Sequence, residues 1–476
     1  MVSLFILAPF AAALILNLLP KALTHRLAFW VAAGLALAQA ALVAFHPLLF
    51  WSAYPDPLGP FFNLQFSLDG LSLVTLLSIA IVVLATLVAG RYTITEESKR
   101  FNFTNLVLIT LMGMNAVAMT TDLFSLYVFL EVCAIALFIL IALKKDKLAL
   151  EGAFKYLILS AIATVLMLFS IALFLLLSGG VSFSVIYGAL SGSGGGFLAK
   201  LAMGLFLCGL FIKAGLAPFH AWLPDAHSSA PSAASVLLSG MVTKIPGAYI
   251  LMRLVTSVFP LNPQMQNLLM FVGVFSIIIG AQGAFYQHNF KRMLAYSSVS
   301  QVGYIVLALG CGTPLAFAGA AFHLFNDAIS KTLLFVNACC LEKETGTVDM
   351  DKMGGLGQRM PITNFSCLVG AFSAAGLPPL AGFWSKFIII LALMQAGKPV
   401  YATVAILASI LTLGYALVMQ RKIFFGGLAD GLQQAKEAGI GLVLLESALA
   451  LVVIAVGIGF AFMYNNFMLP VGEIVF

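Results

Sequence analysis

Residues 211–253 decide the fold of this chain, and they read FIKAGLAPFHAWLPDAHSSAPSAASVLLSGMVTKIPGAYILMR. Two apolar runs in this stretch each carry an interior lysine, Lys213 in the first and Lys244 in the second. Pro218 lies between them, where it would break the helix that carries Lys213. The segment between the runs is polar, and we predict that it forms a hairpin that contains His220, Asp225 and His227.

Both lysines fall in runs that are apolar enough to enter a membrane. An ammonium group at membrane depth costs about 2.5–3.5 kcal/mol on insertion scales, so such a lysine is by default a functional residue. The alternative is a lysine near a helix end whose long side chain reaches the membrane surface. That alternative suits Lys213 better than Lys244, which has long apolar flanks.

The composition is that of a polytopic membrane protein. The 476 residues are 62% hydrophobic and 9% charged, which leaves almost no room for a soluble domain. The six cysteines lie in apolar runs without a Cys-X-X-Cys motif, so we expect no iron–sulfur, zinc or disulfide site. No glycine-rich phosphate loop follows a strand, and nothing suggests a nucleic-acid partner. We therefore expect neither a metal nor a cofactor.

Apolar runs of about 20 residues predict an all-α fold with about fourteen transmembrane helices, in a single membrane domain that spans residues 1–476. The seventh run is broken at Pro218 and the twelfth at residues 376–379, where the sequence is Gly-Leu-Pro-Pro. The runs lie near 2–19, 27–49, 69–90, 103–120, 122–143, 152–177, 197–217, 232–258, 265–286, 293–312, 314–341, 362–396, 401–425 and 440–464.

Basic residues alternate between the predicted loops. Seventeen of the 24 lysines and arginines fall in loops that follow odd-numbered helices, and three fall in the opposite loops. Basic loops stay on the cytoplasmic side, so we expect a multi-pass protein of the inner (cytoplasmic) membrane with both chain ends on the outer face. The other four lie inside apolar runs: Lys213, Lys244, Lys331 and Lys386.

A short pattern occurs twice, as AGLAP at 214–218 and AGLPP at 375–379, each time at a helix break with a lysine nearby. The two breaks are separated by an odd number of helices, so the copies would have opposite orientations in the membrane. Paired broken helices point to an inverted-repeat transporter. We predict helices 1–3 within about 1–90, two inverted five-helix repeats at about 103–258 and 265–425, and helix 14 at about 440–464.

Glu131 lies in the middle of an apolar run without a basic residue nearby in the sequence. A carboxylate in such a place is either protonated or paired with a cation from another helix. The shortage of other partners points to a pair with Lys213. The alternative is a simple hydrogen bond between two helices.

His323, Asp327 and Lys331 are spaced by four residues, which places them on one helix face along roughly 12 Å. Such a line suits a proton relay, because histidine titrates near neutral pH. The alternative is an Asp327–Lys331 pair that only holds helices together. Lys386 follows the second break and is a further candidate for an ammonium group at membrane depth.

The remaining ionisable residues have simpler interpretations. Glu446 lies away from both broken helices, so we expect it to face a partner or a lipid headgroup. Asp69 and Asp122 precede helices, where N-capping is expected. Access to the proton path, or support for it, is expected from His220, His227, Asp225, Glu151 and Lys155, the last two being an i, i+4 pair.

Several motifs together resemble one family. Residues 211–240 with Lys244 are followed by KRMLAYSSVSQVGY at 291–304, HLFNDAISKTLLF at 323–335 and GLPPLAGFWSKF at 376–387. With SLDGLS, the Glu131 helix and EGAFKYLILSA, they resemble the antiporter-like membrane subunits over nearly the whole chain. That family comprises the proton-pumping subunits of respiratory complex I, the large subunits of Mrp-type antiporters and the matching subunits of energy-converting membrane hydrogenases.

The resemblance implies fourteen helices with two inverted five-helix repeats. By position it also implies roles: Glu131 and Lys213 form the ion pair of a first half-channel, Lys244 is the central lysine, His323 and Lys331 form a connecting line, and Lys386 is the exit-side lysine. The chain departs from the family pattern in four places: Lys386 replaces the glutamate of one complex I branch, Asn289 a frequent aspartate, Gln301 an occasional histidine, and Asp327 a frequent second histidine.

We therefore expect a proton-translocating subunit of a redox-driven ion-pumping complex, either complex I-like or energy-converting-hydrogenase-like. It would carry H⁺, with Na⁺ as the alternative ion, and would lie in the lipid bilayer beside other membrane subunits of the complex. Two rival functions remain open. One is a subunit of an Mrp-type cation/proton antiporter without a redox partner, and the other is a passive scaffold or bicarbonate-uptake partner with vestigial charges.

Overall fold

The computed structural model of the chain describes residues 3–45, 66–192, 196–469 and 471. In this part of the chain all regular secondary structure is helical, and strand-like pairing is limited to isolated bridges. The helices up to the first break are α1 (Leu4–Leu18), α2 (Lys21–Ala44), α5 (Gly70–Thr93), α6 (Glu97–Met119), α7 (Leu123–Ile141), η2 (Ala142–Lys144), α8 (Lys147–Ser178), α9 (Phe183–Gly192) and α10 (Phe197–Ala214).

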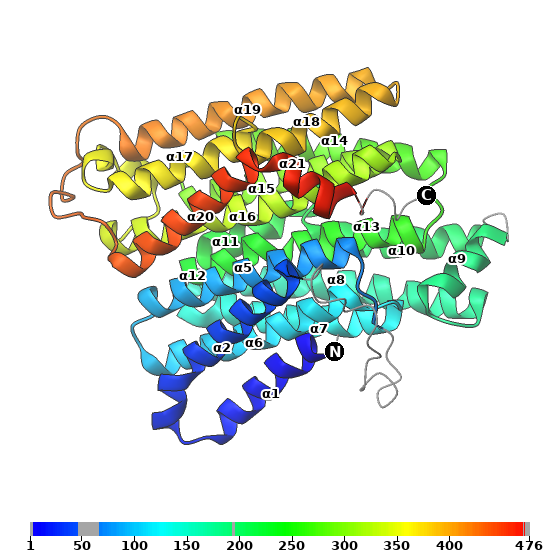
Figure 1. Cartoon of the computed structure of the whole chain (residues 1–476), viewed down its shortest axis with the longest axis horizontal. Coiled ribbons are helices and arrows are strands. Elements are labelled where there is room, and N and C mark those ends of the chain that lie inside the picture. The colour runs from blue at the N-terminus through cyan, green and yellow to red at the C-terminus, as the bar shows by residue number, and fades with distance from the viewer. Residues whose placement is uncertain (1–2, 46–65, 193–195, 470, 472–476) are drawn as a thin grey trace.

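The second part of the chain continues the same architecture (Figure 1). Its helices are η3 (Phe219–Ala221), α11 (Trp222–Ser229), α12 (Ser232–Leu237), η4 (Leu238–Val242), η5 (Lys244–Tyr249), α13 (Ile250–Ser257), α14 (Pro263–Phe285), α15 (Phe290–Cys311), α16 (Pro314–Thr345), η6 (Met350–Lys352), η7 (Leu356–Gln358), α17 (Pro361–Ala375), α18 (Ala381–Gln395), α19 (Pro399–Phe424), α20 (Ile440–Ile458), α21 (Phe460–Met463) and η8 (Tyr464–Met468).

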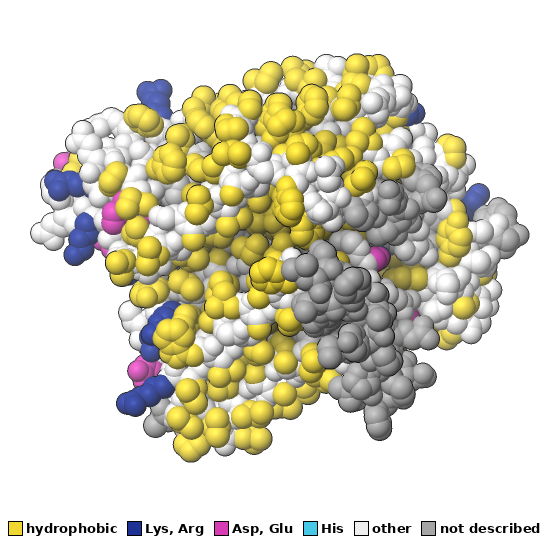
Figure 2. All heavy atoms as spheres, viewed as in Figure 1, with side chains coloured by type: hydrophobic (Ala, Val, Ile, Leu, Met, Phe, Trp, Pro, Cys, Tyr) yellow, Lys and Arg dark blue, Asp and Glu magenta, His cyan; other side chains and the backbone are white. Residues whose placement is uncertain are grey.

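Twelve helical segments in the described residues are long and apolar enough to cross a membrane, and α1, α17 and α18 are shorter apolar helices. Hydrophobic side chains also cover the outer faces of the helices, as contact with lipid requires (Figure 2). The predicted all-α, polytopic membrane fold is therefore confirmed. The count of fourteen spans and the two inverted repeats stay predictions, and residues 46–49 of the second predicted run lie outside the described residues.

Both predicted helix breaks are present. α10 ends at Ala214, and Gly215 takes a left-handed conformation with φ of 65°. α17 ends at Ala375, and Gly376 does the same with φ of 88°. Glycine adopts this conformation with little strain, so each AGL sequence ends a helix at its glycine; the first helix therefore ends three residues before the break predicted at Pro218.

The segment between the first break and α12 is not the predicted hairpin. One 3₁₀ turn, η3, follows Pro218 directly, and α11 then continues as a short helix. α10 has already ended at Gly215, and Pro218 immediately precedes η3, because proline is tolerated where a helix starts. The Trp222 indole donates to the Ile212 carbonyl oxygen at 3.0 Å, which holds α11 against the end of α10.

The predicted helix over 232–258 is present but changes its winding in the middle. Its central part forms two π-helical segments, η4 and η5, between the α-helical ends α12 and α13. Lys244 begins η5. π-Helical turns are rare and frequent at functional sites, so the helix departs from regular geometry at the lysine that the sequence singles out.

α16 is the buried centre of the bundle: residues 316–341 are all buried. The loops that join α1 to α2, α5 to α6 and α19 to α20 lie at the left end of Figure 1. Lys and Arg side chains gather mainly at that end on the face shown in Figure 2. The asymmetry of basic residues that the sequence predicts is therefore visible in three dimensions.

Candidate functional site

The first charged group of the interior is the pair that the sequence predicts. Lys213, on α10, places its ammonium nitrogen 2.9 Å from Oε1 of Glu131, on α7. Lys213 is buried, and it also donates to the Ser160 hydroxyl at 3.2 Å. Thr164 donates to the same Glu131 oxygen at 2.5 Å. The carboxylate therefore has both a cation and a neutral donor within reach, so it keeps a hydrogen bond if the lysine moves away.

The second charged group joins the two predicted repeats. Lys244 lies 3.0 Å from Asp327, on α16, and both side chains are buried. The lysine also donates to the Ser239 carbonyl oxygen at 2.5 Å, in the preceding π-helical segment. Removing both charges from water is costly unless they compensate each other, so this pair depends on its short separation.

The position of Asp327 contradicts the alternative of an Asp327–Lys331 pair, and the relay itself stays a prediction. The i, i+4 spacing does place His323, Asp327 and Lys331 on one helix face, but the ion pair forms with Lys244 and not with Lys331. Lys331 extends towards α15, where it donates to the Ser297 hydroxyl and to the Leu294 carbonyl oxygen. Sequence spacing along α16 could not include Lys244, because η5 brings it in from another part of the chain.

The third group surrounds the second helix break. Lys386, on α18, donates to the Ala374 carbonyl oxygen at 2.8 Å, in the last turn of α17. Its nitrogen lies 4.5 Å from the centre of the Tyr304 ring, an arrangement that stabilises a cation. The same ring lies 5.6 Å from the His323 ring, and His323 contacts the Ser385 hydroxyl at 2.9 Å. Tyr304 thus connects His323 to Lys386.

The expected support residues on the basic side form a charged cluster. Lys155 lies 2.8 Å from both Glu151 and Asp225, and Arg292 contacts the other oxygen of Asp225. These residues line a surface cavity of about 280 Å³, together with Asn289. The cavity lies where α8, α11 and α15 meet.

The two histidines of this region differ. His220 is only partly buried and packs against the Tyr296 ring at 5.9 Å. His227 is fully buried, its ring lies 4.8 Å from that of Phe335, and neither ring nitrogen has a hydrogen-bond partner among the described residues.

Glu446 contradicts the expected partner-facing or lipid-facing position. Its side chain is completely buried. It accepts hydrogen bonds from Thr363 at 2.9 Å, from Asn337 at 2.8 Å and from Cys340 at 3.4 Å. The prediction was wrong because α20 packs this face against α16 and α17, which the hydrophobicity of the run does not reveal.

Arg253 is one of the three basic residues that the predicted topology places in the outer loops, and it instead lies buried in α13. Its guanidinium group donates to both carboxylate oxygens of Asp69. It also donates to the Ser72 hydroxyl at 2.7 Å and to the Tyr249 hydroxyl at 2.9 Å. Asp69 caps α5 as predicted, through the Ser72 amide at 2.9 Å. Burial favours the neutral acid, but the hydrogen bonds and charge of Arg253 outweigh it and lower the pKa of Asp69.

A second missed cluster joins the helix ends on the basic side. Glu342 pairs with Lys144 at 2.9 Å and lies 3.7 Å from Lys291, and Ser232 donates to it. Lys291 is buried in the first turn of α15, although the charge count assigns it to a loop. The sequence contains no signal for this cluster, because Lys291 lies between His288-Asn289-Phe290 and Arg292 and its partner Glu342 is on another helix.

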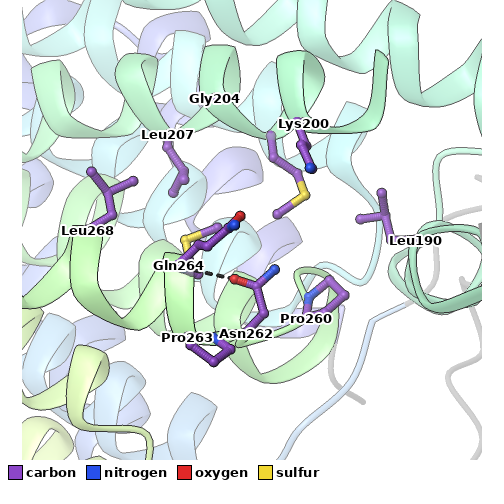
Figure 3. Close-up of a pocket in the computed structure, with 11 residues that line it drawn as sticks. Leu190, Lys200, Gly204, Leu207, Pro260, Asn262, Pro263, Gln264 and Leu268 are labelled. Carbon is purple, nitrogen blue, oxygen red and sulfur yellow. Dashed lines mark hydrogen bonds between the residues drawn. The ribbon is translucent and has the colours of Figure 1, made fainter. Parts of the chain in front are cut away.

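A groove of about 640 Å³ lies between α9, α10 and the start of α14 (Figure 3). Its lining is mainly apolar, and Lys200 is its one basic side chain. Lys200 and Lys213 are separated by more than three turns of α10, about 20 Å along the axis. The groove is therefore not part of the buried charged groups.

Comparison with known proteins places this arrangement in a family. The family model described as NADH:quinone oxidoreductase/Mrp antiporter, TM matches residues 120–412, more than half of the chain. A Na(+)/H(+) antiporter subunit of Alkalihalophilus pseudofirmus is 35% identical over 78% of this chain and 74% of its own length. An NADH-quinone oxidoreductase subunit of Desulforudis audaxviator is 32% identical over 84% of this chain and 81% of its own.

The fold agrees with these relatives. A chain of the Mrp complex from Dietzia sp. DQ12-45-1b superposes with a TM-score of 0.90, at 24% identity, over 100% of this chain and 97% of that chain. At that identity the likeness concerns the fold alone. The matched sequence and the shared architecture lead to one conclusion: this chain is a member of the NADH:quinone oxidoreductase/Mrp antiporter family of membrane subunits.

Proposed function

We propose that this chain is the proton-translocating, antiporter-like membrane subunit of a redox-driven ion-pumping complex, of the complex I or energy-converting hydrogenase kind. The observation that carries the proposal is that two buried lysines contact carboxylates, Lys213 the partly buried Glu131 and Lys244 the buried Asp327. Intramembrane ionisable groups of this kind mark ion pathways. The relative named as a subunit of NADH-quinone oxidoreductase supports a redox partner.

The first half of the proposed pathway uses Glu131 as a movable countercharge. When Glu131 pairs with Lys213, the ammonium form of the lysine is stabilised. When Glu131 moves away from Lys213 and keeps its hydrogen bond from Thr164, Lys213 remains buried without a countercharge and releases its proton towards the centre. Thr243, which precedes Lys244, packs beside Gly215 at the end of α10, so the two lysines are carried by elements in direct contact.

The second half continues along α16 to the second break. Lys244 passes the proton towards Lys331 and His323, and Lys386 holds it beside Tyr304 at the exit side. Asp327 compensates the charge of Lys244 when the central lysine is protonated. Because these groups interact, they titrate as a set and not as independent sites. His220, His227, Asp225, Glu151 and Lys155 support access from the basic side.

A second candidate function is a subunit of an Mrp-type cation/proton antiporter without a redox partner. The 35% identical relative, which is named as a subunit of a Na(+)/H(+) antiporter, favours it. In that case the same buried lysines would carry protons, and the driving force would be an ion gradient in place of an electron transfer.

Affinity purification of the full chain in mild detergent, with identification of the co-purifying subunits, separates the two functions. Subunits that contain iron–sulfur or nucleotide sites support the redox-driven complex. Recovery of only small cation-antiport subunits supports the antiporter. Recovery of the chain alone, in the same detergent in which a known complex of this kind stays intact, argues against both.

The proposal extends to the organisation of the chain. We propose a single membrane domain, with helices 1–3 followed by two inverted repeats at about 103–258 and 265–425 and a last helix at about 440–464. The matching AGL breaks support these repeats. We also propose the inner (cytoplasmic) membrane as its location and the outer face for both chain ends, which the distribution of basic residues supports.

A further inference from the structure

We propose that Glu446 is a protonatable station on a second polar path, which leads from the loop between α19 and α20 into the interior of α16. This proposal rests on the proposed function, because the path would supply protons to the second half of the charged line. It assigns a role to a buried carboxylate that the Lys213–Lys386 line does not use.

The surroundings of Glu446 are polar but uncharged. Its donors are the Thr363 hydroxyl at 2.9 Å, the Asn337 amide at 2.8 Å and the Cys340 thiol at 3.4 Å. None of the ion pairs between described residues includes Glu446. An ionised carboxylate buried without a cation is costly, and the neutral acid avoids that cost. The site is therefore built to hold and release a proton.

Glu437 connects this site to the surface. It is partly exposed in the loop before α20, and it accepts hydrogen bonds from the Ile362 amide at 2.7 Å and from the Thr363 hydroxyl at 2.8 Å. The Thr363 hydroxyl thus lies between two carboxyl groups. A hydroxyl has one proton to donate, so Thr363 can donate to one carboxyl group while it accepts a hydrogen bond from the other when that group is protonated.

This geometry defines a proton transfer that balances. If Glu437 is protonated, it donates its proton to the Thr363 oxygen while Thr363 gives its own proton to Glu446. The O–H bond of Glu437 breaks, that of Glu446 forms, and the hydroxyl of Thr363 is restored with the opposite orientation. No redox partner or other reactant is needed.

Asn337 continues the path into α16, since it donates to Glu446 and lies 2.7 Å from the Ser366 hydroxyl. Two turns towards the N-terminus of α16, the Ser330 hydroxyl contacts Asn326 and Ser373 beside the second helix break. Leu333 and Leu334 lie between these two polar groups. Both leucines pack at Gly370, where a Cβ would come within 2.9 Å of Leu334, so the path is closed by an apolar layer in this conformation.

The other groups that face Glu446 do not provide a charge. Cys340 and Cys367 approach from α16 and α17, and both are buried thiols. α5 and α18 contact α20 at other positions, through Tyr92 beside Gly441 and through Trp384, which donates to the Gly457 carbonyl oxygen. Lys343 follows Cys340 by three residues on α16, but its ammonium donates to the Ala438 carbonyl oxygen in the loop at 2.9 Å. Glu437 is therefore the ionisable group through which Glu446 exchanges protons.

Infrared difference spectroscopy of the full chain, purified with its co-purifying subunits, tests the proposal. A jump in external pH should change a carboxylic acid C=O band, and Glu446→Gln should remove that band. Thr363→Val, which keeps the side-chain volume, and Glu437→Gln should keep the band but slow its response several-fold. Glu344→Gln, at the same end of α16, is the matched control and should change neither.

The outcomes are decisive in both directions. A missing carboxylic acid band, or a response in Thr363→Val as fast as in the unmodified protein, would overturn the proposal even if Glu446→Gln does not fold. Proton transport in vesicles should fall several-fold in Glu446→Gln. If Glu446→Gln transports fully while Lys213→Ala is inactive, the proposal for Glu446 is also overturned. Full transport by Lys213→Ala would instead contradict the proposed function. The infrared measurement would still show whether Glu446 exchanges a proton through Thr363.

Discussion

Lys213 and Lys386 share an electrostatic setting that explains why each can be charged inside a membrane. Lys213 occupies the last turn of α10, and the ammonium of Lys386 binds the Ala374 carbonyl oxygen in the last turn of α17. The free carbonyl groups at a helix C-terminus carry a partial negative charge, which favours a cation. A helix broken within the membrane places that charge at depth, so each break forms part of a cation site.

Lys213→Ala should abolish coupled proton transport in reconstituted vesicles while the complex still assembles, because it removes a titrating group from the line. Lys213→Arg should not restore transport, since a guanidinium remains charged at working pH and cannot release its proton. Lys200→Ala, on the exposed face of the same helix, is the control and should transport normally. Full transport by the arginine variant would rule out Lys213 as a proton carrier.

Glu131→Gln should impair transport, because the glutamine keeps the shape of the side chain but leaves Lys213 buried without a countercharge. The double variant Glu131→Gln with Lys213→Met should be no worse than the more severe single variant. Transport rates of the three variants in vesicles give the coupling energy between the two residues. Strictly additive losses would argue against the pair as a functional unit.

Asp327→Asn should disable transport, because it leaves Lys244 in a fully buried site without its carboxylate partner. Breaking a buried ion pair in this way costs about 3–5 kcal/mol. Transport by the unmodified protein should not depend on sodium, since one carboxylate beside a lysine is a poor site for a cation that prefers several oxygen ligands. Sodium-dependent transport that disappears in Asp327→Asn would show that Asp327 binds the cation.

The buried ion pairs show which side-chain contacts can be predicted from the sequence and which cannot. Glu131 has so few alternatives in its surroundings that Lys213 could be named as its partner, and the two side chains do meet. Asp327 has a histidine and a lysine one turn away, so the alternative to a relay was a pair with Lys331, and that alternative was wrong. Its partner, Lys244, is placed by contacts between distant helices, which no local spacing encodes.

The π-helical segments η4 and η5 are the element that positions Lys244. Two glycines allow them to approach their neighbours: a Cβ on Gly240 would meet Thr332 of α16 at 2.7 Å, and one on Gly247 would meet the Ala214 backbone of α10 at 2.5 Å. The change of winding was not predictable, because the apolar pattern of 232–258 is the same for an α-helix. Glycines and Pro246 within the run were the only local signs.

Gly247→Ala should separate η5 from α10 and shift Lys244 away from Asp327. Overpacking of this kind costs about 1–3 kcal/mol, so the thermal unfolding midpoint of the purified complex should fall and transport should weaken. Gly204→Ala is the matched control, because a Cβ at that position of α10 meets nothing within 4 Å. Equal unfolding midpoints for the two variants would contradict a close contact between η5 and α10.

For the whole molecule, the long apolar runs were enough to predict an all-α membrane fold and the two broken helices, because the cost of exposing a polar backbone to lipid leaves few other structures. What the sequence could not give was the packing order of the helices. Glu446 illustrates this: the run that carries it is apolar on every side, and only contact with α16 and α17 shows that it faces the interior. Membrane sidedness rests on a different signal, the charge of the loops.

That signal makes a prediction independent of the buried lysines. Cysteines introduced at Lys398, between α18 and α19, and at Lys436, between α19 and α20, lie at opposite ends of α19. In a Cys208→Ser background, which removes the exposed native thiol, a membrane-impermeant maleimide applied to whole cells should label the Lys398→Cys variant. It should label the Lys436→Cys variant only after permeabilisation, because basic loops stay in the cytoplasm. The reverse pattern would place both chain ends in the cytoplasm. Glu437, in the loop between α19 and α20, would then take up protons from the outer side and not from the cytoplasm, and no contact inside the bundle would change.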